Sequence, residues 1–257
     1  MFRNIYPVFE VKRLLKKEML ENLRDFPRSL FDLQYQNYSD GILAGCGIKG
    51  TEEGLTILPG ILCYKGVPYF LDKPYPVSCR AEGKLVYIKV HFWDKAIGSG
   101  GEEFFSQVVV DEQKPDAEQE LEIGRFKLQA GARLRTEYVD FYDYETEFDT
   151  VNRIYVPYAA PDCPSIWPQL LKSFAGELIC HSLTNPWDTA FCLSCLQLRE
   201  AMPYDAVRAY LNAKLGQDKE YTNMQVYNAL KSILREAGGR KEEPGRSQKK
   251  EGTLLML

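Results

Sequence analysis

Hydrophobic side chains recur along this chain with two different periods, and the change between them predicts its organisation. Residues 8–25 carry apolar side chains at a spacing that lines one face of a helix. Pro27 ends or bends this run, and a second short helix is predicted in 28–38. We therefore expect residues 1–40 to form an N-terminal helical segment. The apolar stripe consists of Val11, Leu14, Leu15, Met19 and Leu23.

From Gly41 to about Pro161 apolar side chains alternate with other residues, which is the period of a β-strand. Glycines separate the alternating runs, and Lys65–Gly66 suits a tight turn with positive φ. The segment 96–103, rich in glycine, is predicted to be a hairpin loop. Short strands with turns at this frequency predict an antiparallel β-sandwich or small barrel. Predicted strands lie in 55–63, 67–71, 84–93, 103–110, 122–129 and 153–160.

After Pro161 the helical period returns, so residues 162–238 are predicted to form a helical bundle. Asn185 is a suitable N-cap, and Gly216 and Gly238 are natural helix ends. The predicted helices start near residues 165, 185, 202 and 222. The charged residues 239–257 lack periodicity and are predicted to be a disordered tail. The expected fold class is α+β, with 41–161 as the β domain between the helical parts.

Composition and charge narrow the class of protein. With 45% hydrophobic and 26% charged residues, the 257-residue chain has the composition of a soluble globular protein. A net charge of −4 provides no overall attraction for nucleic acid. Charges interrupt every apolar run near the N-terminus, so we expect no signal peptide and no membrane span. The seven cysteines are then expected to be reduced thiols in the cytosol.

Residues Gly45 to Gly50 spell G-x-G-x-x-G, the fingerprint of a dinucleotide site. Such a site needs a helix that leaves the glycines and points its N-terminus at a pyrophosphate. Here a strand is predicted next, and Lys49-Gly50-Thr51 has the wrong order for a phosphate loop. We interpret these glycines as turn residues of a β domain and expect no cofactor.

A C-x-x-C pair, Cys192 and Cys195, follows Cys180 and His181 and could supply soft ligands to zinc. The pair lies within a helical pattern, where thiols three residues apart usually pack as small hydrophobic groups. No bound metal is expected on this interpretation, although a metal or redox role stays open.

The segment 137–149 combines carboxylates with aromatic side chains. Paired carboxylates could serve a glycosidase or hold Ca²⁺, so a carbohydrate-active or carbohydrate-binding protein is one alternative. An exposed acidic loop held by its aromatic residues is the favoured interpretation. The carboxylates are Glu137, Asp140, Asp143, Glu145, Glu147 and Asp149.

Basic residues offer a second alternative, a nucleic-acid-associated protein. They lie on the first predicted helix and in the tail, and each region nets only about two positive charges. Solvated surfaces are the favoured interpretation, and the terminal TLLML could dock elsewhere. The tail residues are Arg240, Lys241, Arg246, Lys249 and Lys250.

Residues 39–77 contain D-G-I-x-x-G, then L-T-I-x-P-G, then a short hairpin G-x-x-Y-x-L. This segment resembles a small β module of bacteriophage tail fibre and baseplate proteins, which fastens fibres or adaptors to a tail. The whole chain resembles uncharacterised prophage proteins of anaerobic gut bacteria. A helicase function, attached to some of these, is not supported by the residues, because a phosphate loop and a basic channel are missing.

The resemblance implies a non-enzymatic structural or adaptor protein of a phage tail, baseplate or tail-like particle. Its partners would be other virion or tail proteins, and it could be a homo-oligomer. It would be made in the bacterial cytoplasm and then join the particle. Binding would depend on a few aromatic anchors on a β surface. The candidates are Tyr64, Tyr69, Phe70, Tyr75 and Trp93, of which about half are expected to face the core.

Overall fold

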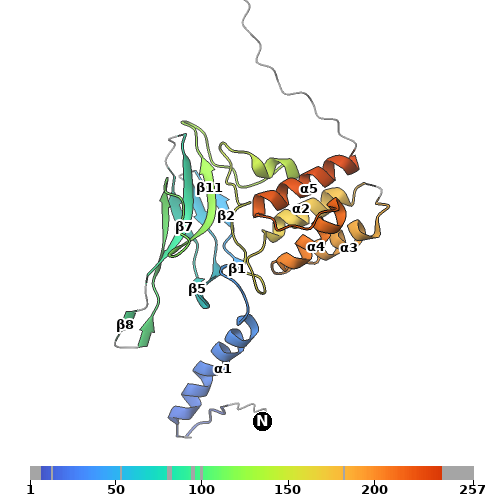
Figure 1. Cartoon of the computed structure of the whole chain (residues 1–257). Coiled ribbons are helices and arrows are strands. Elements are labelled where there is room, and N and C mark those ends of the chain that lie inside the picture. Colours follow the sequence, from blue (N-terminus) through green and yellow to red (C-terminus); the bar gives the residue numbers. More distant parts are fainter. Residues whose placement is uncertain are drawn as a thin grey trace, which may run out of the picture.

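A β-sandwich and a bundle of helices lie side by side, and a separate helix projects from one end of the sandwich (Figure 1). The computed structural model describes residues 7–12, 14–52, 54–79, 83–93, 96–98, 101–181 and 183–238, with only the backbone for 96–98 and 101–103. The fold is α+β with antiparallel sheets, an N-terminal helix and C-terminal helices, as predicted. The predicted disordered tail, 239–257, lies outside the described residues.

The first layer of the sandwich is a three-stranded antiparallel meander that bends in the middle. The bend divides it into two small sheets, ordered β1-β4-β5 and β2-β3-β6. The first strand of the meander is β1 followed by β2, the second is β3 followed by β4, and the third is β5 followed by β6. The bounds are β1 (Gly41–Gly45), β2 (Ile48–Gly50), β3 (Gly54–Ile57), β4 (Gly60–Tyr64), β5 (Val67–Leu71) and β6 (Tyr75–Ser78).

The bend depends on glycines at which two backbones nearly touch. Gly45 has a φ of +66°, and a Cβ there would overlap the Pro59 carbonyl oxygen. A Cβ on Gly60 would lie 2.6 Å from the Ala44 carbonyl oxygen and closer still to the Cys46 nitrogen. The G-x-G-x-x-G segment therefore leads from β1 into β2, with no helix following it. Its glycines allow the close approach of strands and form no cradle at a helix N-terminus.

The second layer is the antiparallel sheet β10-β7-β11, joined at its centre by a buried ammonium group. Lys89 on β7 is almost fully buried, and its Nζ lies 3.1 Å from Asp111 on β10 and 2.9 Å from Glu120 on β11. The segment 96–103, predicted to be a hairpin loop, forms a hairpin of two short strands, β8 and β9, which projects from the same end of the sandwich as α1 (Figure 1). The bounds are β7 (Leu85–Phe92), β8 (Ala96–Gly98), β9 (Gly101–Glu103), β10 (Ser106–Asp111) and β11 (Glu120–Lys127).

The chain between β11 and the bundle covers the edges of the sandwich that face the helices. Residues 148–152 bridge to β11, and residues 157–160 run parallel to β1, where the Ala159 amide donates to the Ile42 carbonyl. The strand predicted at 153–160 is wrong, because this segment makes only isolated bridges to its neighbours. Pro157 and Pro161 cannot donate to a ladder, so extended pairing is interrupted.

The bundle contains the four predicted helices and a short 3-10 helix, η1. Asn185 caps α3 by accepting from the Trp187 amide, and Gly216 ends α4 with a φ of +62°. The buried Asp188 accepts from the Lys214 ammonium at 2.6 Å and from the Tyr210 hydroxyl at 3.0 Å, which joins α3 to α4. The bounds are η1 (Phe141–Glu145), α2 (Pro168–Leu178), α3 (Pro186–Leu196), α4 (Tyr204–Leu215) and α5 (Asn223–Gly238).

Buried apolar side chains gather in two main clusters, one between the sheets and one among the helices. The chain around residues 134–160 supplies both: Leu134 and Val156 belong to the sandwich cluster, whereas Phe141 and Ile154 belong to the bundle cluster. The division into domains at Pro161 stays a prediction.

The N-terminal helix differs from its prediction. A single helix, α1 (Lys17–Tyr35), runs through Pro27, and the residues described before Lys17 are not helical. Val11 and Leu14, which were expected on its apolar stripe, lie before the helix and are exposed. None of the helices in the described part of the chain has the length and apolar composition that a bilayer span requires.

The bend can be tested with one methyl group. Gly60→Ala should lower the free energy of unfolding by about 3 kcal/mol or more, because its Cβ collides with backbone atoms that cannot move independently. Gly176→Ala is the matched control: nothing lies within 4 Å of its Cβ on α2, so it should stabilise by about 1 kcal/mol. Chemical denaturation of both variants measures the difference, and equal stabilities would contradict the strand contact.

Candidate interaction surface

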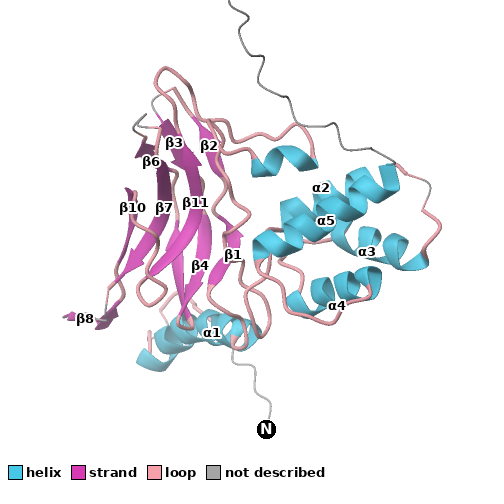
Figure 2. Ribbon diagram, turned by 45° about the horizontal axis from the view of Figure 1, so that its top comes forward, coloured by secondary structure: helices cyan, strands magenta, loops and turns pink. Residues whose placement is uncertain are grey.

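In the described part of the chain the sandwich has one open side, where the edge strands of both layers carry no further strand. These edge strands are β5 and β6 in the bent meander and β10 in the second sheet. Strands β6 and β10 lie on the side away from the helical bundle (Figure 2). Pro68 stands on the β5 edge, where its missing N–H interrupts the row of free donors. A proline on an edge strand hinders edge-to-edge pairing with strands of other chains. The rest of the edge stays available to a specific partner.

Of the five aromatic residues proposed from the sequence, Tyr69, Phe70 and Tyr75 lie on the edge strands of this open side, and Trp93 follows the central strand β7 and lines a hollow together with Tyr69. Phe70, Tyr75 and Trp93 are 66%, 41% and 46% exposed, and Tyr69 is half-buried beside them. Tyr64 is the exception: it is buried, its ring stacks on Phe92 at 4.0 Å, and its hydroxyl donates to the Glu118 carbonyl. Tyr64 is therefore a core residue, because the alternation along β4 turns it toward the second sheet.

Phe104 and Phe105 were missed by the sequence analysis. Phe105 is 50% exposed just before β10, and Phe104 packs edge-on against Tyr69 with ring centroids 6.4 Å apart. Both break the alternation of the predicted strand 103–110, since β9 ends before them and β10 begins after them. Neighbouring side chains on a strand point to opposite faces, so at least one of two adjacent phenylalanines must face outward. The Phe-Phe pair in the sequence was therefore a signal from which an exposed aromatic residue could have been predicted. We call Tyr69, Phe70, Tyr75, Trp93 and Phe105 the open-edge surface.

An apolar cavity of about 240 Å³ opens between the edge strands. Buried side chains of both sheets form its floor, including Ile57, Leu62 and Ile123, whereas Phe70 and Tyr75 stand at its mouth. Across the mouth lie Ser106 and Gln107, which are exposed polar residues on β10. A hydrophobic floor with a polar rim suits an inserted apolar side chain of a partner protein.

A second hollow, of about 560 Å³, separates α1 from β5. The Phe31 and Phe70 rings face each other across it, with centroids 6.2 Å apart. Phe70 lines both hollows, so it lies at the centre of the open side.

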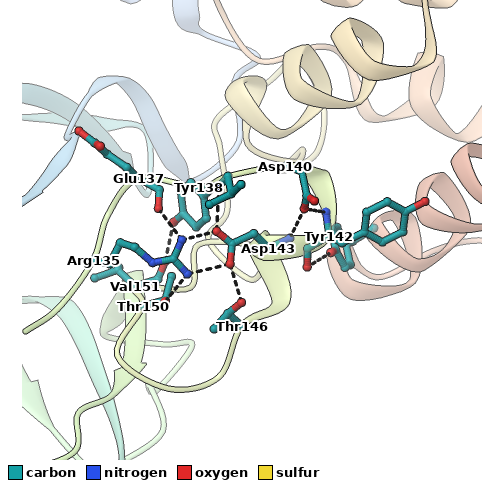
Figure 3. A network of polar contacts seen from close by, with 11 residues as sticks. Arg135, Glu137, Tyr138, Asp140, Tyr142, Asp143, Thr146, Thr150 and Val151 are labelled. Carbon is teal, nitrogen blue, oxygen red and sulfur yellow. Dashed lines mark hydrogen bonds and ion pairs between the residues drawn. The ribbon is translucent and has the colours of Figure 1, made fainter. Parts of the chain in front are cut away.

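The acidic segment 137–149 uses its carboxylates to hold the chain together (Figure 3). The carboxylate of Asp143 accepts from the Arg135 guanidinium, from the Val139 amide and from the Thr146 hydroxyl. These bonds, the one from Arg135 above all, hold the pKa of Asp143 well below its usual range. Asp140 caps η1 by accepting from the amides of Tyr142 and Asp143.

The other carboxylates of the segment pair in different directions. Glu145 pairs with Lys231 on α5, Glu147 pairs with Lys127 on β11, and Asp149 accepts from the Gln129 amide. A glycosidase needs two carboxylates that flank one bond of a bound sugar. The arrangement found here instead joins the sandwich to the bundle.

The cysteine pair on α3 is part of the bundle core. Burial raises the pKa of Cys192 to about 11 and that of Cys195 to about 12, so both are protonated thiols at neutral pH. Cys180 is exposed, and its thiol donates to the Gly176 carbonyl. Among the residues that the structure describes, no three histidine, cysteine or acidic side chains converge as a metal site would require.

The basic residues of α1 are neutralised by neighbours on the same helix. Lys17 pairs with Glu21, Arg24 with Asp25, and Arg28 with Asp32. These pairs leave no basic stripe along α1 for phosphates to follow. The basic residues of the tail and the terminal TLLML lie outside the described residues.

The structural role of Asp143 predicts a pH dependence of stability. Since its folded-state pKa is lowered, its contribution is complete at neutral pH and is lost as the pH falls below the ordinary carboxyl range. Asp143→Asn should lower the free energy of unfolding by about 2 kcal/mol at pH 7. The difference in this free energy between the variant and wild type should shrink in acid. Glu137→Gln, an exposed carboxylate in the same segment, is the control and should change stability by less than about 0.5 kcal/mol. A constant difference from pH 7 to pH 3 would contradict the ion pair.

Comparison with known proteins gives a distant likeness in structure alone. The chain matches no protein-family model, and no curated protein is similar to it in sequence. A chain of the type VI secretion system TssK–TssF–TssG baseplate subcomplex is similar with a TM-score of 0.43 at 11% identity, covering 93% of this chain and 100% of its own. The crystal structure of TssK is similar with a TM-score of 0.37 at 8% identity, covering 90% of this chain and 71% of its own. A chain of the type VI secretion baseplate complex is similar with a TM-score of 0.37 at 11% identity, covering 92% of this chain and 99% of its own.

Proposed function

We propose that this chain is a non-enzymatic adaptor of a phage tail, baseplate or tail-like particle, and that it binds another tail protein through the open-edge surface. The observation that carries the proposal is the combination of unpaired sheet edges, exposed aromatic rings and an apolar cavity on one side of the sandwich. The proposal includes assembly in the bacterial cytoplasm before the chain joins the particle. The solved structures to which the chain is similar also come from baseplates, a likeness too distant to carry the proposal.

The tail-like sequence module supports this proposal through the backbone geometry that it produces. Asp40 accepts from the Lys65 amide at 2.6 Å, which holds the start of β1 against the β4–β5 turn. Gly41 has a φ of +149°, and a Cβ there would lie 2.6 Å from the Ala159 nitrogen. Pro59–Gly60 forms the bend in the second strand. The residues shared with tail modules therefore form the bent meander that bears the open edge.

The open-edge surface provides the two kinds of contact by which proteins recognise a partner at a sheet. Exposed backbone of β5 and β10 can pair with an added strand, which gives affinity through main-chain hydrogen bonds. Phe70 and Trp93 can become the buried anchors of such a contact, and Ser106 and Gln107 lie on its polar rim. The acidic segment and the buried thiols are committed to the fold, which favours the open side as the surface that binds a partner.

The test removes two of the exposed aromatic rings. Phe70→Glu with Trp93→Glu should weaken binding to the partner at least about 100-fold, since each buried aromatic anchor is worth about 2 kcal/mol or more. The measurement is the affinity for tail and baseplate proteins encoded beside the gene of this chain, each purified after co-expression with it. Trp187→Glu is the control, because Trp187 is 66% exposed and belongs to α3, a helix on the opposite side of the molecule from β10 (Figure 2).

The result can exclude the proposal in two ways. If wild type binds none of the neighbouring tail proteins, the adaptor role is wrong. If the control weakens binding and the double variant does not, the partner contacts the bundle. Circular dichroism should show unchanged folding for both variants, since none of the three side chains is buried.

A further inference from the structure

Helix α1 is amphipathic, and yet it buries none of its residues. Five of its large apolar side chains are between 48% and 67% exposed, whereas Met19 and Phe31 are half-buried. A helix on the surface of a single domain normally turns its apolar stripe toward the core. The exposed residues are Leu20, Leu23, Phe26, Leu30 and Leu33.

The helix turns its charged side toward its own sandwich. Arg24, Arg28 and Asp32 line the hollow between α1 and β5, together with Phe31. At about 100° per residue, the centre of the apolar stripe lies roughly 150° around the helix from these residues. The apolar stripe therefore points away from the body of the protein, and Figure 1 shows α1 projecting from the end of the sandwich.

Four of these exposed residues, together with the half-buried Met19 one turn before Leu23, follow the spacing of a coiled coil. Successive positions are separated by four, three, four and three residues, which is the spacing of core positions in a heptad. We call these five residues the seam. They are Met19, Leu23, Phe26, Leu30 and Leu33.

Charged residues are excluded from the positions beside the seam. The flanking positions, which face a neighbouring helix in a coiled coil, carry uncharged residues. All charged residues of α1 fall at positions that point away from the seam. The flanking residues are Leu20, Asn22, Pro27, Ser29 and Gln34, and the charged ones are Lys17, Glu18, Glu21, Arg24, Asp25, Arg28 and Asp32.

The heptad spacing ends where the helix begins. Continued toward the N-terminus, it would place Lys16 and Lys12 in the seam, and helix α1 starts at Lys17. At the other end, Phe31 and Tyr35 pack against the outer face of β1 and β4. The seam and the helix thus have the same start, and the last turns of the helix are attached to the sandwich.

We propose that the seam is a self-association surface, and that the α1 helices of other copies of this chain cover it. Identical helices can meet along these residues without repulsion, because no like charges face each other across uncharged flanks. A different partner would be selected by complementary charges beside the seam, and the flanks carry none. The inference does not depend on the proposed function, since the seam faces away from the hollow that contains Phe70.

The experiment compares two variants that change the net charge equally. Leu23→Lys with Leu30→Lys adds two positive charges in the seam, and Glu18→Gln with Asp25→Asn removes two negative charges outside it. Isolated helices of this length are marginal in water, so association is expected to depend on concentration between about 1 and 100 µM. Sedimentation equilibrium of the full chain measures the mass at each concentration.

Wild type and the outer-face variant should reach multiples of 29.5 kDa, whereas the seam variant should stay at 29.5 kDa throughout. Since Leu23 and Leu30 are exposed, the seam variant should keep the far-ultraviolet spectrum of the sandwich and bundle. A monomeric wild type at every concentration would overturn the inference. A seam variant that still associates would overturn it as well. If the wild type is monomeric and α1 binds a helix of a different protein, the seam is a surface for that protein and the inference is wrong.

Discussion

The structure depends on one close approach of two strands, at the bend of the meander. Gly45 and Gly60 allow the backbones to come within a distance that no Cβ permits, and the bend frees the Cys46 carbonyl from the ladder. The guanidinium of Arg153 donates to that carbonyl at 3.1 Å and lies over the Trp167 ring, with its carbon 4.8 Å from the ring centroid. Because Trp167 precedes α2, a single buried cation links the bend of the sandwich to the start of the bundle.

This linkage explains why the two sides of the sandwich differ. On the side of the bundle, the segment that carries Arg153 also lies along β1 and β11 and covers their edges. The carboxylates of 137–149 attach the same segment to α5 and to β11, so acidic residues that could serve a binding site are used for assembly of the fold. On the opposite side the described residues contain no such segment, and β5, β6 and β10 stay at the edge, where Phe70 and Tyr75 are exposed.

The open-edge surface and the α1 seam lie on opposite sides of helix α1, because the hollow between α1 and β5 contains Phe70 and is lined by the charged side of the helix. Phe70 belongs to the open-edge surface and faces Phe31 on the inner side of α1, whereas the seam occupies the outer side of the same helix. One end of the sandwich thus offers an aromatic edge for a different protein and an apolar helix for copies of the same chain. A ring or cluster of chains joined through α1 would present several aromatic edges at once, and multiple weak contacts then add to a strong attachment.

The sequence by itself determined the parts of this protein that follow from local periodicity and turn chemistry. Alternation indicated β7, β10 and β11, the N-cap Asn185 and the C-cap Gly216 marked their helices, and the glycines of 45–50 were identified as backbone elements of a β domain. It also predicted that about half of the five aromatic candidates would face the core: Tyr64 is buried, whereas Phe70, Tyr75 and Trp93 are exposed, and their role in binding stays a proposal.

Only the tertiary structure decided which side of each element finds a partner. Periodicity gives the apolar face of a helix but not the direction in which that face points, so the outward turn of α1 could not be read from its sequence. Tyr64 is buried, and the segment 153–160 lies beside β1 without forming a ladder, because distant strands determine what covers each of them. Burial is a property of neighbours that are far apart in the chain, and a sequence alone does not contain their positions.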